Sequence, residues 1–141
     1  MRRKHILAAA LIASLLLVLL GGCSQFGIDV HDRLSLFAAN LNAVDRSTLN
    51  DQFDKPLVTM IATMNTAWWN TNFPPPPDPE HAYSVTLLDY VDPANVVATI
   101  MGPPLFNGFS AAPVNAVFVM SKEGADWFIL KVSLNGTVVI Q

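Results

Sequence analysis

The sequence predicts an α+β fold, with N-terminal helices packed on one face of a curved antiparallel sheet of four or five strands. Apolar residues recur at helical spacing between residues 30 and 71, but follow strand-like patterns from Tyr83 to the end. Four consecutive prolines at 74–77 separate the two halves, because a proline run has no amide hydrogens to give to a helix. Helices followed by strands are typical of α+β proteins, and 141 residues fit one domain.

The first helix is expected over residues 30–42. Asp29 precedes it as an N-cap, because a short acidic side chain there can accept a hydrogen bond from the first turn. Its apolar positions fall on a single stripe, which would face the sheet. The stripe contains Val30, Leu34, Phe37, Ala38 and Leu41.

Two further helices are expected before the prolines. Asp45 is placed as the N-cap of a short helix that carries Leu49 and Phe53 on one face. Asp54 is placed as the next N-cap, and the helix after it is expected to continue to about residue 71. Pro56 would stand in its first turn, where a missing N–H costs nothing.

Five strands are expected after the prolines. The first contains Tyr83, and the others cover residues 96–101, 114–120, 127–134 and 137–141. Residues 122–124 are expected to form one turn, and Asn135-Gly136 another, because both residues accept the positive φ of a type I′ hairpin. A loop over 105–113 carries Phe106 and Phe109, which we interpret as exposed candidates for contact with a ligand or a partner.

The N-terminus has the pattern of an export signal. Three basic residues at 2–4 precede an apolar run over 6–20, which is short for a membrane span and typical of a signal-peptide core. The run ends in Leu20-Gly21-Gly22-Cys23, which resembles the lipobox of bacterial lipoproteins. The resemblance implies that residues 1–22 are removed, with Leu20, Gly21 and Gly22 recognised by the peptidase.

The same resemblance implies lipidation at Cys23, by diacylglycerol on the thiol and an acyl chain such as palmitate on the new amine. Two or more acyl chains give stable membrane anchoring. Residues 23–28 would then be a lipidated tether, and residues 29–141 the single folded domain. Ser24 in place of an aspartate favours the outer membrane, facing the periplasm, if the host is Gram-negative.

Two stretches of the domain resemble NTF2-like (SnoaL-like, cystatin-like cone) proteins. Residues 33–45 followed by Leu49 and Phe53 are similar to the helical opening of that family, and residues 118–129 are similar to its penultimate hairpin. The resemblance implies helices folded over a cone-shaped sheet. The family has a short strand after its second helix, often followed by an acidic pocket residue, whereas this chain has Asp54-Lys55-Pro56 there.

Enzymes of that family use an acid or histidine with a tyrosine inside an apolar cone, so the corresponding catalytic candidates are Tyr83, Asp89, Tyr90 and Asp92. The alternative interpretation is structural: Asp89 and Asp92 flank a surface turn and Tyr83 packs in the core or at its rim. Asp45, the acid most similar to the family's, is explained by helix capping.

Composition narrows the classes of partner. Without residues 1–22 the chain carries five Lys and Arg against eleven Asp and Glu, a net charge of −6, which argues against nucleic acid. The single cysteine and the two remaining histidines, His31 and His81, form no ligand cluster, so we expect neither a metal nor a cofactor.

Surface contacts are expected from two places. Trp68 is assigned to the core and the adjacent Trp69 to a contact with a partner or ligand, because neighbouring helical residues diverge by about 100°. The last hairpin is expected to have two apolar faces, which predicts a homodimer through the outer face of the sheet. One face would hold Phe128, Leu130, Val132 and Leu134, and the other Trp127, Ile129, Val138 and Ile140.

The leading functional hypothesis is a membrane-anchored lipoprotein of the cell envelope that binds an envelope protein or a small apolar ligand without catalysis. The first alternative is a small isomerase- or cyclase-type enzyme that uses an Asp/Tyr pair. The second is a structural or assembly subunit.

Overall fold

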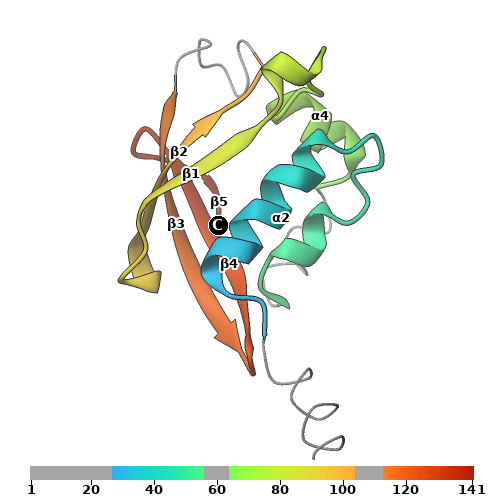
Figure 1. The fold of residues 1–141 in the computed structure, drawn as a ribbon. Helices are drawn as coiled ribbons and strands as arrows, with labels where there is room; N and C mark the ends of the chain where they lie inside the picture. Colours follow the sequence, from blue (N-terminus) through green and yellow to red (C-terminus); the bar gives the residue numbers. More distant parts are fainter. Residues whose placement is uncertain (1–26, 56–63, 104–112) are drawn as a thin grey trace, which may run out of the picture.

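The computed structural model describes residues 27–55, 64–103 and 113–141, and it has the predicted α+β architecture (Figure 1). Short helices come first, and a five-stranded antiparallel sheet follows in the order β1-β2-β3-β4-β5. Helix α2 lies across one face of the curved sheet. The elements are α2 (Val30–Asn42), η2 (Leu49–Gln52), α4 (Thr66–Asn72), η3 (Pro79–His81), β1 (Ser84–Asp89), η4 (Pro93–Asn95), β2 (Val96–Met101), β3 (Val114–Glu123), β4 (Asp126–Leu134) and β5 (Thr137–Ile140).

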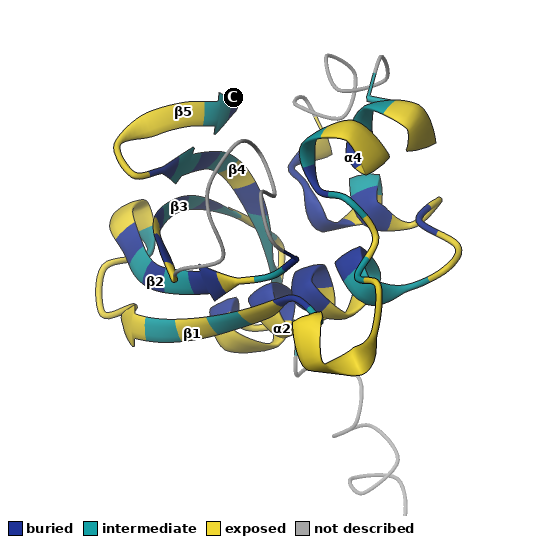
Figure 2. Ribbon diagram, turned by 90° about the horizontal axis from the view of Figure 1, so that it is seen from above, coloured by how far each residue is buried: buried dark blue, intermediate teal, exposed yellow. Residues whose placement is uncertain are grey.

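The prediction for α2 is confirmed at both ends. The Asp29 carboxylate accepts a hydrogen bond from the Asp32 amide at 2.8 Å, and the helix ends at Asn42. All five residues of the predicted apolar stripe are buried. Figure 2 shows buried positions on the sides of α2 and the strands that face each other, so the stripe holds the helix on the sheet.

The segment after α2 differs from the prediction. Asp45 does not cap a helix: its carboxylate accepts the Ser47 amide at 2.9 Å in a local turn, and η2 begins at Leu49 after Thr48. An aspartate two residues before a backbone N–H makes this turn easily, and it competes with helix capping. Leu49 and Phe53 are nevertheless both buried, as predicted.

The continuous helix expected to reach residue 71 is also wrong. Met64 and Asn65 are not helical, and α4 begins at Thr66. The Asn65 side chain accepts the Trp68 amide at 3.1 Å, so it caps a new helix where the apolar spacing alone predicted an uninterrupted one. The expected roles of Asp54 as a cap and Pro56 in its first turn depend on residues 56–63, which lie outside the described residues.

The strand predictions are close to the structure. Strand β3 continues to Glu123, so the turn is at Gly124 and Ala125 and not at 122–124. Asn135 and Gly136 have φ of +48° and +81°, as the predicted type I′ turn requires.

Strand β4 departs from simple alternation. The register with β3 shifts between Lys131 and Ile129, which leaves Leu130 as a bulge residue, 39% exposed. A bulge moves the following side chains to the opposite phase, so Ile129, Val132 and Leu134 are all buried. The predicted grouping of Phe128 and Leu130 with Val132 is therefore wrong.

The outer face of the sheet is mixed in character and not uniformly apolar. Val97 is opposite Val117, but Val119 is opposite Lys131, and the half-buried Ser133 is opposite Val138. The homodimer through this face stays a prediction.

Aromatic rings fill the space between the helices and the sheet. Phe37 of α2 is at the centre, with ring centroids of Phe53 at 5.9 Å, Phe118 at 6.0 Å and Phe73 at 6.4 Å, all edge-to-face. Trp69 joins this cluster at 1% exposure, whereas Trp68 is only partly buried. The prediction that Trp68 is in the core and Trp69 at the surface is therefore wrong, and the two roles are reversed. Because α4 is a separate helix that begins after Asn65, the apolar spacing of the preceding segment does not determine which of its faces is buried.

Candidate functional site

A buried arginine joins the ends of two helices. Arg46, 3% exposed, donates from Nη2 to the carbonyl of Leu41 in the last turn of α2. Its Nη1 donates to the carbonyl of Phe73, just after α4, and to Asn70 Oδ1 at 3.2 Å. Carbonyls at helix ends lack partners inside the helix, and the guanidinium donates to the Leu41 carbonyl at such an end.

The electrostatics of Arg46 are unusual for a buried cation. Desolvation lowers the pKa of its guanidinium, and no carboxylate lies within ion-pair distance in the described part of the chain. Its Nε is buried and has no acceptor among those residues. Sequence reasoning missed Arg46, because a lone arginine in a loop gives no signal that it will be buried.

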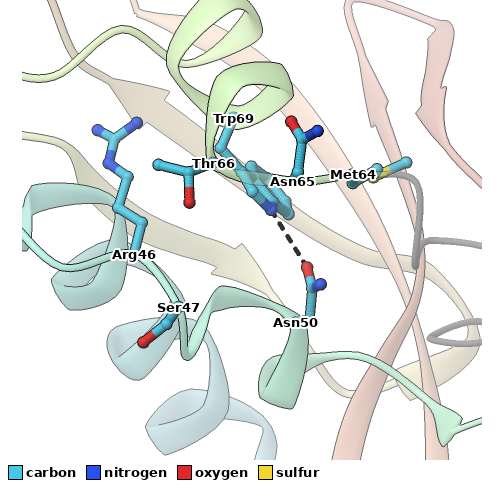
Figure 3. Close-up of a pocket in the computed structure, with 7 residues that line it drawn as sticks. All are labelled: Arg46, Ser47, Asn50, Met64, Asn65, Thr66 and Trp69. Carbon is cyan, nitrogen blue, oxygen red and sulfur yellow. Dashed lines mark hydrogen bonds between the residues drawn. The ribbon is translucent and has the colours of Figure 1, made fainter.

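A pocket of about 180 Å³ lies beside Arg46, between η2 and the start of α4 (Figure 3). The indole Nε1 of Trp69 donates to Asn50 Oδ1 at 3.1 Å across the pocket. The described lining consists of Arg46, Ser47, Asn50, Met64, Asn65, Thr66 and Trp69.

The chemistry of this lining is that of hydrogen bonding without acid–base catalysis. It offers hydroxyl, amide and guanidinium groups, and its described members include no Asp, Glu, His, Lys or Cys. Such groups can orient a polar ligand, but none of them titrates near neutrality. Trp69, expected to contact a partner, therefore contributes to a pocket wall from a position inside the core.

A second pocket of about 230 Å³ also borders η2. It is lined by Asn50, Asp51, Phe53, Lys55 and Phe128. The guanidinium of the buried Arg33 lies 4.3 Å from the centre of the Phe128 ring, and its Nε donates to the Trp127 carbonyl at 2.6 Å. Its Nη1 donates to Gln52 Oε1 at 2.9 Å, so Arg33 ties α2 to η2 and to β4.

The structure does not bring the predicted catalytic residues together. Tyr83 is 3% exposed just before β1, and its hydroxyl donates to the Pro74 carbonyl at 3.0 Å. Asp89, at the far end of β1, is exposed and accepts the Val91 amide at 3.1 Å. Tyr90 is exposed as well, and Asp92 accepts the Ala94 amide at 3.0 Å. The two acids thus flank a surface turn, as the structural interpretation predicts.

The two histidines in the described residues, His31 and His81, are both at the surface. His81 Nδ1 lies 2.7 Å from Asp78 Oδ1, and His31 Nδ1 lies 3.8 Å from Asp32. No group of three metal-ligating side chains occurs within residues 27–55, 64–103 and 113–141. The predicted contact residues Phe106 and Phe109, and the lipobox with Cys23, lie outside the described residues.

The comparisons add no relative: no protein-family model, no curated protein and no solved structure matches the chain. Among the described residues, no helix has the length and apolarity that crossing a bilayer requires.

Proposed function

We propose that this chain is a membrane-anchored lipoprotein whose NTF2-like domain binds a small ligand without catalysis. The observation that carries the proposal is the lining of the pocket beside Arg46, which holds several hydrogen-bonding groups but no described acid, base or thiol. A binding site needs orienting polar groups, whereas an isomerase or cyclase also needs a group that moves a proton.

The architecture supports the NTF2-like assignment. Helices precede a curved antiparallel sheet, and Phe53 forms a one-residue parallel bridge to Ile129. This bridge stands after the second helix, where the family has a short strand. In the described part of the chain the space between the helices and the sheet is occupied by the aromatic cluster around Phe37, which favours a ligand at the polar edge over an apolar ligand in the centre.

The ligand class follows from the donors. Arg46 is a cation with no carboxylate partner among the described residues, and the indole, amide and hydroxyl groups around it suit a ligand rich in oxygen acceptors. We therefore infer a small anion or a neutral polyhydroxyl compound. Lipidation at Cys23 would hold this site in the cell envelope, at the periplasmic face of the outer membrane in a Gram-negative host.

The indole N–H of Trp69 provides a direct test, because it lies in the pocket wall and bonds to Asn50. Its NMR resonance would be followed while acetate, inorganic phosphate or glucose is added to the full chain. We expect one of the three probes to shift it. Thr66→Val should weaken that effect several-fold, whereas Thr71→Val, on the same helix but outside the pocket lining, should not. An unshifted indole resonance with all three probes contradicts the proposed site.

The anchor is tested separately. Mass spectrometry of the N-terminal peptide from bacterial membranes should show an acylated Cys23, and the Cys23→Ser chain should lack acyl groups. An unmodified cysteine in the membrane fraction would remove the lipoprotein assignment while leaving the pocket hypothesis intact.

A further inference from the structure

The first described residues are bonded to the tip of the β3–β4 hairpin. The Ile28 amide donates to Asp126 Oδ1 at 2.8 Å, and the Trp127 amide donates to the Ile28 carbonyl at 2.9 Å. Gly27 packs so closely on Ala125 that a Cβ there would lie 1.9 Å from the Ala125 carbonyl oxygen. The N-terminal entry to the domain is therefore held at one end of the sheet.

This contact limits the distance between the hairpin and the anchor. Cys23 precedes Gly27 by four residues, and an extended chain covers at most about 3.5 Å per residue, or about 14 Å in all. The inference rests on the proposed lipidation at Cys23. With that anchor, the hairpin tip cannot move far from the headgroup layer, which is itself several ångströms deep.

The tip has the chemistry of an interfacial contact. Trp127 is only partly buried, and the Lys122 ammonium lies 5.6 Å from its ring centre. An amphipathic indole and a lysine with a long apolar stem are side chains suited to the boundary between headgroups and acyl chains. Gly124 and Ala125, at the turn, are small and exposed, so they present no bulky obstacle.

The charges at this end do not form a basic patch. Glu123 lies 3.5 Å from the Lys55 ammonium, Asp126 accepts the Ile28 amide, and Asp29 caps α2. Asp32 is exposed nearby on the first turn of α2. Anionic lipids attract clusters of Lys and Arg, and the described residues at this end form no such cluster. The complementary surface is a zwitterionic headgroup layer.

We propose that the tip of the β3–β4 hairpin, residues 122–127, rests on the bilayer that holds Cys23, with Trp127 and Lys122 at the interface. This contact orients the whole domain. Helix α2 begins beside the tip and extends for 13 residues, about 20 Å, away from it. Arg46, which lines the proposed pocket, bonds the Leu41 carbonyl in the last turn of α2, so this part of the pocket lies at the end of the helix away from the tip.

The test compares two labelled positions on the full lipidated chain, whose only native thiol is consumed by the anchor. Ala125→Cys places a fluorophore at the hairpin tip, and Thr137→Cys places one beside the opposite end of β3, where the Asn135 amide bonds to the Asn115 carbonyl. Both proteins are reconstituted in vesicles of phosphatidylcholine and phosphatidylethanolamine that include a nitroxide-headgroup lipid.

We expect quenching to be several-fold stronger at position 125 than at 137, and to be unchanged when phosphatidylglycerol replaces part of the phosphatidylcholine. Equal quenching at both positions, in protein that floats with the vesicles, overturns the hairpin contact and leaves the anchor standing. Quenching at 125 that appears only with phosphatidylglycerol overturns the zwitterionic contact. Protein that lacks acyl groups and does not float overturns the anchor, and the contact with it.

Discussion

The two ends of α2 each have a buried arginine, and the two arginines are held differently. Arg33, in the first turns, is bonded through Nε and Nη1, lies against the Phe128 ring and is attracted by the carboxylates of Asp126 and Asp51. Arg46, just after the helix, bonds carbonyl and amide oxygens, has no carboxylate partner in the described regions, and leaves Nε without an acceptor there. The comparison separates an arginine that lies near carboxylates and an aromatic ring from one held by backbone carbonyls and a side-chain amide.

The largest expected effect is at Arg46. Arg46→Met removes the buried hydrogen bonds from the guanidinium to the carbonyls of Leu41 and Phe73, so unfolding free energy should fall by about 3 kcal/mol. Arg46→Lys should recover only part of this loss, because a compact ammonium cannot span both carbonyls. Urea denaturation followed by tryptophan fluorescence measures both. A loss below that of Arg33→Met would contradict the ranking of the two arginines.

Arg33→Met should cost less, about 2 kcal/mol, through lost hydrogen bonds and the contact with Phe128. Arg46→Lys and Arg33→Met should also differ in ligand binding. Any probe that shifts the Trp69 indole resonance should bind Arg46→Lys more weakly than the native protein and bind Arg33→Met with unchanged affinity. Equal losses of affinity would show that the pocket responds to general destabilisation.

Sequence patterns predicted the elements that depend on local signals. The Asp29 cap, the apolar stripe of α2 and the Asn135-Gly136 turn are each determined by residues within one element, and the structure agrees with them. The bulge at Leu130 and the burial of Arg46 depend on distant partners, so the linear pattern has no signal for them. The pocket was missed for the same reason, because its wall combines a loop with a helix that restarts at Asn65.

The tether contact should be sensitive to a single methyl group. Gly27→Ala places a Cβ against the Ala125 carbonyl, a clash with backbone that cannot rotate away. We expect a loss of about 1.5 kcal/mol and faster hydrogen exchange at the Trp127 amide, whose acceptor is the Ile28 carbonyl.

Gly136→Ala serves as the control, because it is strained by a φ of +81° but has open space around its Cβ. It should lower the free energy of unfolding by about 1 kcal/mol. Hydrogen exchange at the Trp127 amide should then speed up only as much as this global loss of stability requires. Similar Trp127 exchange in both variants would mean that Gly27 does not hold the tether on the hairpin.

The smallest loss of stability is expected at Tyr83, a catalytic candidate that the structure places in the core. Tyr83→Phe removes the hydrogen bond to the Pro74 carbonyl and should cost about 1 kcal/mol at neutral pH.

Burial raises the pKa of the Tyr83 phenol above its ordinary value of 10.0, so the folded state holds this proton when the unfolded state releases it. Stability from this group is complete below pH 10 and falls as the pH rises further. Tyr83→Phe should therefore flatten the loss of stability above pH 10, measured by denaturation at a series of alkaline pH values. An unchanged alkaline slope would show that Tyr83 is reached by solvent, and would return it to consideration as a reactive group.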